Sequence, residues 1–88
     1  MSERFQLHPD LRLTALAGEG VALHLGSRRY FTVNGTGLDL LEALKTPHTM
    51  DELAQLLSSK YDVTDEQARS SALAFVERCR AAGLLRPA

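Results

Sequence analysis

The sequence predicts an α+β protein in which a small three-stranded antiparallel sheet is followed by three helices. Apolar and polar residues alternate over three early segments, which is the pattern of half-buried strands: Leu11–Leu16, Val21–Leu25 and Arg28–Val33. Beyond Asn34 the apolar residues recur at spacings of three and four, as on the buried face of a helix. The 88 residues are enough for one domain around one core.

The segment before the first strand has a different character. We expect residues 1–10 to form a flexible lead-in, with Phe5 and Leu7 available to pack on the body or on a second copy, and residues 11–85 to form the single domain. Turns are predicted at Gly18-Glu19-Gly20 and at Gly26-Ser27. Because side chains alternate along a strand, the third strand has two different faces: Arg29, Phe31 and Val33 on one, Tyr30 and Thr32 on the other.

Capping residues predict where the three helices begin and end. Asn34 or Thr36 caps the first helix, which ends before Pro47. The second and third helices begin at capping boxes, in which a threonine and a Glu or Gln three residues later satisfy free backbone N–H groups: Thr49 with Glu52, and Thr64 with Gln67. Gly83 is expected to end the third helix, with Leu84 packing back on its last turn.

The third helix has a wider apolar surface than a simple amphipathic helix needs. Leu73 and Val76 lie beside the core stripe and are bordered by Arg69 and Arg80; the core stripe is Ala68, Ala72, Phe75, Cys79 and Ala82. This second stripe predicts either a broader core contact or the floor of a groove. If the far edge of Arg28–Val33 is unpaired, an extended segment of another chain can add there as a strand. The alternative is that the aromatics and the second stripe complete a small core.

Composition excludes several classes of protein. The 44% hydrophobic and 24% charged residues are typical of a globular domain, and the net charge of -1 lacks the basic excess of nucleic-acid-binding proteins. No apolar run reaches the roughly 18 to 20 residues that span a bilayer, and no signal-peptide core is present, so we expect a cytoplasmic protein without membrane attachment. The single cysteine, Cys79, is expected to be a small buried hydrophobe.

Residues that could carry catalysis or bind a metal are dispersed. His8, His24 and His48 are isolated, so no metal site is predicted. Two acidic pairs, Asp51-Glu52 and Asp65-Glu66, fall in first helical turns, where carboxylates stabilise the helix dipole. The Gly35-Thr36-Gly37 junction lacks the lysine of a phosphate loop, and no serine occupies a GxSxG elbow. We therefore expect neither an enzyme nor a cofactor.

From His8 to Leu85 the chain resembles a PqqD-type protein. The resemblance is carried by the run RRYFTVNGTGLDLLEAL, the capped helix TMDELAQLLSSKYDVT and the closing AAGLL, with anchors at Arg29-Tyr30-Phe31, Asn34, Gly37 and Ala82–Leu85. Two departures look like core substitutions. Family members often have a tryptophan in the first helix, where this chain has Leu40 and Leu41, and many have leucine in place of Val33.

The resemblance implies a winged-helix-like fold and a chaperone-like function in the biosynthesis of ribosomally made peptides. The leader of a precursor peptide would add as a strand beside the third strand and be flanked by the third helix. Transferred to this sequence, the peptide-binding residues are Arg28, Arg29, Tyr30, Phe31, Thr32 and Val33 on the strand, and Arg69, Ala72, Leu73, Val76 and Arg80 on the helix. The arginines among them favour an acidic leader.

The resemblance also implies a partner enzyme. A separate maturation enzyme would act on the bound peptide: a leader protease as in lasso-peptide biosynthesis, or a radical SAM enzyme as in PQQ biosynthesis. The alternative is a winged-helix DNA-binding regulator, with the third helix in the major groove. Asp65 and Glu66 at the start of that helix would repel phosphates, so we expect no nucleic acid. Both a monomer and a domain-swapped dimer are compatible with the sequence.

Overall fold

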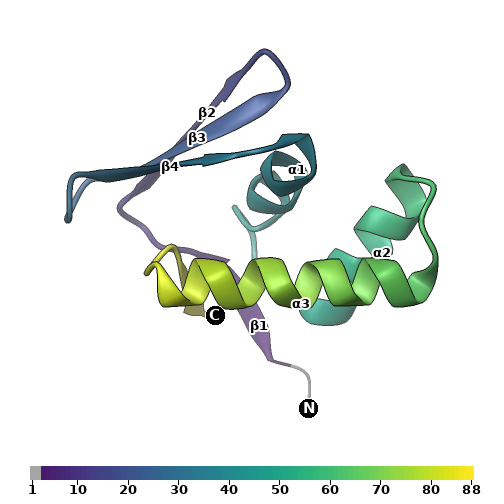
Figure 1. Ribbon diagram of the computed structural model, residues 1–88. Helices are drawn as coiled ribbons and strands as arrows, with labels where there is room; N and C mark the ends of the chain where they lie inside the picture. The colour runs from purple at the N-terminus through teal and green to yellow at the C-terminus, as the bar shows by residue number, and fades with distance from the viewer. Residues whose placement is uncertain (1–2) are drawn as a thin grey trace.

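The computed structural model describes residues 3–88 (Figure 1). Its strands are β1 (Arg4–Leu7), β2 (Leu11–Leu16), β3 (Glu19–His24), β4 (Arg29–Val33), β5 (His48–Thr49) and β6 (Leu85–Pro87). Its helices are α1 (Gly35–Ala43), α2 (Met50–Lys60) and α3 (Asp65–Ala81). The expected three strands followed by three helices are confirmed as β2 to α3, and three short strands add to them.

The strands form two separate antiparallel sheets. One has the order β2-β3-β4, and the other has the order β5-β1-β6. In the first sheet Ala22 of β3 pairs with Leu13 of β2 and with Phe31 of β4, so these three side chains share one face. That face is packed against the core, whereas the opposite face of the sheet is largely exposed. In Figure 1 this sheet lies above α1, and α2 and α3 lie below it.

The N-terminal segment differs from the expectation. Residues 4–7 form β1, the central strand of the second sheet, between β5 and β6. Phe5 is buried, and the backbone N–H of Leu7 donates to the carbonyl of Leu44 over 2.9 Å. The expectation of a flexible lead-in over residues 1–10 is therefore wrong for β1, while residues 1 and 2 lie outside the described part of the chain. Its partner strands β5 and β6 are both distant in sequence, so no local pattern could predict that residues 4–7 would pair with them.

The helices begin and end as the capping residues predict. The side chain of Asn34 accepts a hydrogen bond from the N–H of Gly37 over 2.9 Å, and both capping boxes are formed. The backbone N–H of Thr49 donates to the Glu52 carboxylate, and this bond lowers the pKa of Glu52. After α3, Gly83 has a left-handed φ of +77°, and Leu84 is buried against the last turn.

The core lies between the helices and the inner face of the β2-β3-β4 sheet. Its largest fully buried side chains come from α1 and the residue after it, from α2 and from α3: Leu40, Leu41, Leu44, Leu53 and Val76. Burying each of these side chains contributes about 1.5–3 kcal/mol before entropy is counted. This packing sets the orientation of α3, and therefore decides which face of that helix meets β4.

A polar cluster joins α1 to the end of α2. The Tyr61 hydroxyl donates to one carboxylate oxygen of Asp39, and Lys60 Nζ lies 2.9 Å from the other. The hydrogen bond from Tyr61, followed by that from Lys60, lowers the pKa of Asp39. The same contacts raise the pKa of Tyr61 and of Lys60. The cluster therefore stabilises the packing of α1, the helix that directly follows β4.

Candidate functional site

One edge of the first sheet is available for pairing. β4 is hydrogen-bonded to β3 on one side, and within residues 3–88 no strand pairs with its other side. An edge strand leaves every second backbone N–H and C=O without a partner in the sheet. The outer edge of β4 therefore has free backbone N–H and C=O groups, as strand addition requires.

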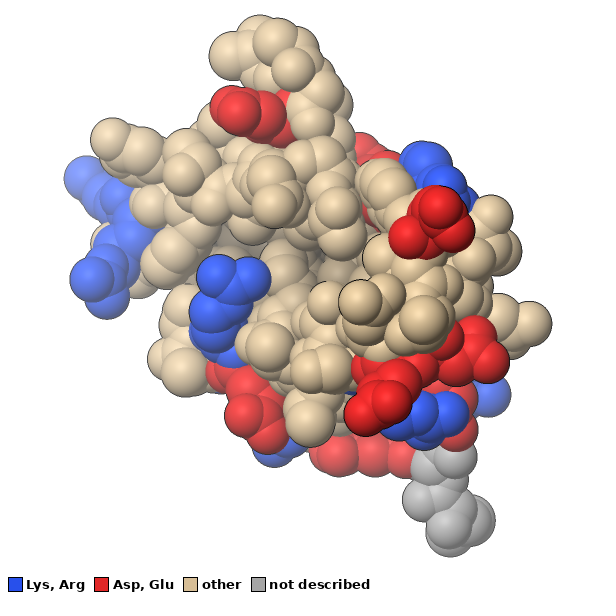
Figure 2. All heavy atoms as spheres, turned by 45° about the vertical axis from the view of Figure 1, so that its right-hand side comes forward, with Lys and Arg blue, Asp and Glu red and all other residues tan. Residues whose placement is uncertain are grey.

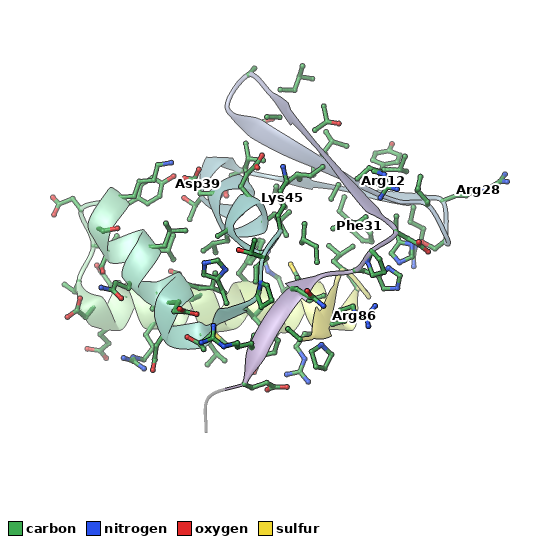
Figure 3. The ribbon with its side chains drawn as sticks, turned by 180° about the vertical axis from the view of Figure 1, so that it is seen from behind. Arg12, Arg28, Phe31, Asp39, Lys45 and Arg86 are labelled. Atoms are coloured by element: carbon green, nitrogen blue, oxygen red, sulfur yellow. The ribbon has the colours of Figure 1, made fainter. Side chains whose placement is uncertain are left out.

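A groove lies between this edge and α3. Its cavity of about 270 Å³ is lined on one side by Phe31, Thr32, Val33 and Asn34, and on the other by Phe75, Arg78, Cys79, Ala82 and Leu84. Figure 2 shows the surface hollowed between two lobes, with basic side chains in blue beside the hollow. In Figure 3 the labelled Phe31 points from β4 toward the helical layer. The lining combines six apolar or weakly polar residues with the hydroxyl of Thr32, the amide of Asn34 and the guanidinium of Arg78.

Gly37 brings the two walls together at one end of the groove. A Cβ atom at this position would lie 2.9 Å from the Cβ of Val33 and 3.0 Å from a ring carbon of Phe75. Both distances are shorter than ordinary carbon contacts, so a larger residue would push α1 away from β4 and α3. The absence of a side chain at Gly37 therefore lets β4, α1 and α3 converge.

The groove continues beyond this point into a more polar hollow. Asn34, Phe75 and Arg78 line both parts, and the second part adds Thr36 and Ser71. The Arg78 guanidinium carbon lies 5.9 Å from the centroid of the Phe75 ring, a cation–π distance. No carboxylate within residues 3–88 forms a salt bridge with Arg78. Its charge is thus available to a ligand in the groove.

The predicted strand residues are divided between two faces of the sheet. Phe31 and Val33 are half-buried and line the groove, whereas Tyr30 is 70% exposed on the opposite face. Thr32 shares the outer face with Tyr30 and borders the groove as well. Arg29 begins β4 and is exposed. Arg28 is not part of the strand: it lies in the preceding turn with φ of +59°, and in Figure 3 it extends away from the body.

The predicted helix residues do not form the groove wall. Ala72 and Val76 are fully buried, so neither side chain is presented to the groove, and their contact with a peptide stays a prediction. Leu73 is 46% exposed but does not line the cavity. Arg69 pairs with Asp51 at 2.7 Å, and the Arg80 guanidinium lies 5.5 Å from the ring of Phe5 on β1. The wall consists instead of Phe75, Arg78, Cys79 and Ala82.

Helical periodicity alone could not distinguish the predicted groove wall of α3 from the observed one. The predicted wall and the observed wall both follow spacings of three and four residues along α3. The spacing of Phe75, Cys79 and Ala82 predicts a core stripe, and this is the face that meets β4. Arg78, which is three residues after Phe75 and four before Ala82, is the signal that could have marked this face as partly solvent-exposed.

The chemistry of the groove is suited to binding. Its lining contains no carboxylate and no imidazole, and burial raises the pKa of the Cys79 thiol to about 11. At neutral pH this thiol is therefore protonated and a poor nucleophile. Across residues 3–88, no group of three or more His, Cys, Asp or Glu lies together in a way that could hold a metal ion. In the same part of the chain, no helix has the length and apolarity to cross a membrane.

Comparison with known proteins identifies similar sequences and folds. The family described as Coenzyme PQQ synthesis protein D (PqqD) matches residues 19–85. A lasso peptide synthetase B1 complexed with the leader peptide is similar in fold, with a TM-score of 0.81, 26% identity, and coverage of 94% of this chain and 98% of that chain. TbiB1 in complex with the TbiA(beta) leader peptide gives a TM-score of 0.84 with 18% identity, covering 92% and 94%. No curated protein sequence matches.

Proposed function

Because this chain belongs to the PqqD family, we propose that it is a non-catalytic adaptor for the leader segment of a ribosomally made precursor peptide. The observation that carries the proposal is the unpaired edge of β4 beside an apolar groove. The likeness to a lasso peptide synthetase B1 complexed with its leader supports it, because the two chains match over nearly their whole lengths. The groove contains the groups that an extended peptide needs and lacks the groups of a hydrolytic centre.

The binding mode that we propose is strand addition. The backbone of the leader would pair with the free N–H and C=O groups of β4 and become a fourth strand of the sheet. Its side chains would then alternate between the groove and the outer face of the sheet. Those directed inward would meet Phe31, Cys79 and Leu84, a surface that fits branched or aromatic side chains. These buried contacts would supply most of the affinity.

Charge would refine the choice of leader. Arg78 lines the groove without an acidic partner in the described chain, and Arg29 begins the edge strand. An acidic side chain in the leader would gain from Arg78, by about 0.2–1 kcal/mol if the pair stays solvated. Arg69 and Arg80, which the sequence analysis assigned to this role, are engaged by Asp51 and Phe5 respectively.

The bound leader would be presented to a separate maturation enzyme in the cytoplasm. A leader protease is favoured over a radical SAM enzyme, since the solved relative that is 26% identical is a lasso peptide synthetase component. The DNA-binding alternative is not supported by the surface of α3. Its first turn carries Asp65 and Glu66, which would face phosphates with like charge, and its middle is buried against the core.

Calorimetry with the leader of the precursor encoded beside the gene for this chain tests the proposal. Ala82 lines the groove but is itself exposed, so Ala82→Trp should fill the groove without disturbing the core. We expect this variant to lose binding by about tenfold or more, as when a buried contact is blocked. The neighbouring Ala81→Trp is the matched control, because Ala81 is exposed on α3 and does not line the cavity. Failure of the unaltered protein to bind the leader, or equal binding by Ala82→Trp, would refute the proposal.

A further inference from the structure

The face of the β2-β3-β4 sheet that points away from the helices carries exposed apolar side chains among polar ones, with no partner in the described chain. We call it the outer face and define it by Leu16, Val21, Leu23 and Tyr30. Leu16 is 66% exposed, Tyr30 is 70% exposed and Leu23 is 38% exposed. Leu23 pairs directly with Tyr30, so their side chains lie side by side across β3 and β4. Figure 1 shows α1 on the other side of this sheet.

Strand addition at β4 would make the outer face continuous with the peptide. A fourth strand would direct every second side chain into the groove and the others onto the same side as Tyr30. The inward side chains would be covered by α3, so a third protein could contact the bound peptide through its outward side chains. A protein that covers these outward side chains and extends across the sheet would meet Tyr30 and Leu23 as well, because they are in the next two strands of the same surface.

We propose that the outer face is the docking surface for the maturation enzyme, an inference that rests on the proposed function. The adaptor supplies no catalytic group in its groove, so the bound peptide has to be reached by another protein. Contact with the outer face and the outward peptide side chains together would let the enzyme bind the loaded adaptor more tightly than the empty one.

Charge at one end of the outer face indicates the chemistry of the matching enzyme surface. Arg12 pairs with Leu23 in the same row as Tyr30, and Arg28 follows in the turn before β4. Figure 3 shows Arg12 and Arg28 toward the same end of the sheet. Neither forms a salt bridge within residues 3–88. The complementary surface on the enzyme would therefore be apolar at its centre, with carboxylates opposite Arg12 and Arg28.

The test separates binding of the enzyme from binding of the peptide. The probes are the purified maturation enzyme encoded beside the gene for this chain and the leader of the neighbouring precursor. Leu16→Asp and Leu23→Asp place a charge on the outer face at β2 and β3, away from the edge strand that would pair with the leader, and Leu73→Asp is the control, since Leu73 is also exposed but lies on α3. We expect both outer-face variants to keep the leader affinity within about twofold and to lose enzyme binding by about tenfold or more. The control should retain both.

Several results would overturn the inference. Loss of leader binding in a folded Leu23→Asp protein would assign the outer face to the peptide, and unchanged enzyme binding in both variants would remove it from the enzyme interface. Sedimentation distinguishes a second copy: a dimer that dissociates in the variants, with enzyme binding retained, would make the outer face a self-association surface. If the unaltered protein fails to bind the leader at all, the proposed function itself fails. Circular dichroism and thermal melting establish that each variant is folded.

Discussion

The guanidinium of Arg69 donates a hydrogen bond to the carboxylate of Asp51 over 2.7 Å, which joins the exposed side of α3 to the first turn of α2. Both side chains are more than half exposed, so the pair adds little to stability. The position of this ion pair matters more than its energy. It marks a face of α3 that is directed away from β4, and it leaves Arg78 as the arginine of α3 that lines the groove.

Replacement of Arg78 should weaken the binding of an acidic leader. We expect Arg78→Gln to raise the Kd by about twofold to fivefold, because a solvated ion pair contributes up to about 1 kcal/mol. The difference should shrink at high salt, where exposed charges are screened. Calorimetry at two salt concentrations measures this effect, with Arg69→Gln as the matched control. An equal loss of affinity in the two variants would contradict the assignment of Arg78 to the groove.

Replacement of Val76 should affect stability and leave the groove chemically unchanged. Val76 is fully buried among the helices, and Val76→Ala removes two methyl groups from a packed site. We expect the free energy of unfolding to fall by about 2 kcal/mol in urea denaturation. The control Leu73→Ala should change it by less than about 0.5 kcal/mol, since Leu73 is half exposed. If Val76→Ala keeps its stability but binds the leader more weakly, Val76 belongs to the peptide site.

The Cys79 thiol should be unreactive in the folded protein. Burial raises its pKa to about 11, so at pH 8 only about 0.1% of the thiol is ionised. We expect an aromatic disulfide reagent to label the native protein at least about 100-fold more slowly than the urea-unfolded chain, in which the thiol has an ordinary pKa. Absorbance of the released thiolate measures both rates. Rapid labelling of the native protein would mean that the groove floor is open to solvent.

The contact between Asp39 and Tyr61 should make stability depend on pH. The folded-state pKa of Asp39 is lowered, so its contribution is present above the pKa of the unfolded chain and is lost as the pH falls through the folded-state value. Asp39→Asn should therefore reduce the free energy of unfolding by about 1 kcal/mol at pH 7 and by less at low pH. Urea denaturation over a pH series measures the difference. Glu42→Gln is the control, because Glu42 pairs with Lys45 on the exposed side of α1. A difference that grows in acid would contradict this account.

Local signals in the sequence predicted the elements well because each depends on neighbours in the chain. The alternation around Leu23 and Phe31 required a strand, and the Thr49 and Thr64 capping boxes required helix starts at those residues. Gly83 needed no tertiary partner to end α3, since its left-handed φ is a local property. The strands β1 and β6 were missed because each is stabilised by the other, at opposite ends of the described chain.

The helical side of the candidate site depended on packing that periodicity does not contain. The stripe that includes Leu73 and Val76 and the stripe that includes Phe75 and Cys79 are both regular on α3, and only one of them can meet β4. The burial of Val76 in the core turned α3 so that Phe75, Arg78 and Cys79 face the strand.

The sequence by itself determined that a short sheet with an aromatic third strand precedes three capped helices, because strand alternation and helix capping act within a few residues. It also contained the resemblance to the PqqD family, and the match of that family over residues 19–85 confirms it. Tertiary structure alone decided that β1 completes a second sheet and that Arg78 lines the groove. It also decided that the face of β4 with Phe31, and not the face with Tyr30, is turned toward the helices. Those features depend on contacts between residues distant in sequence, where the free energy of burial selects one arrangement among several locally equivalent ones.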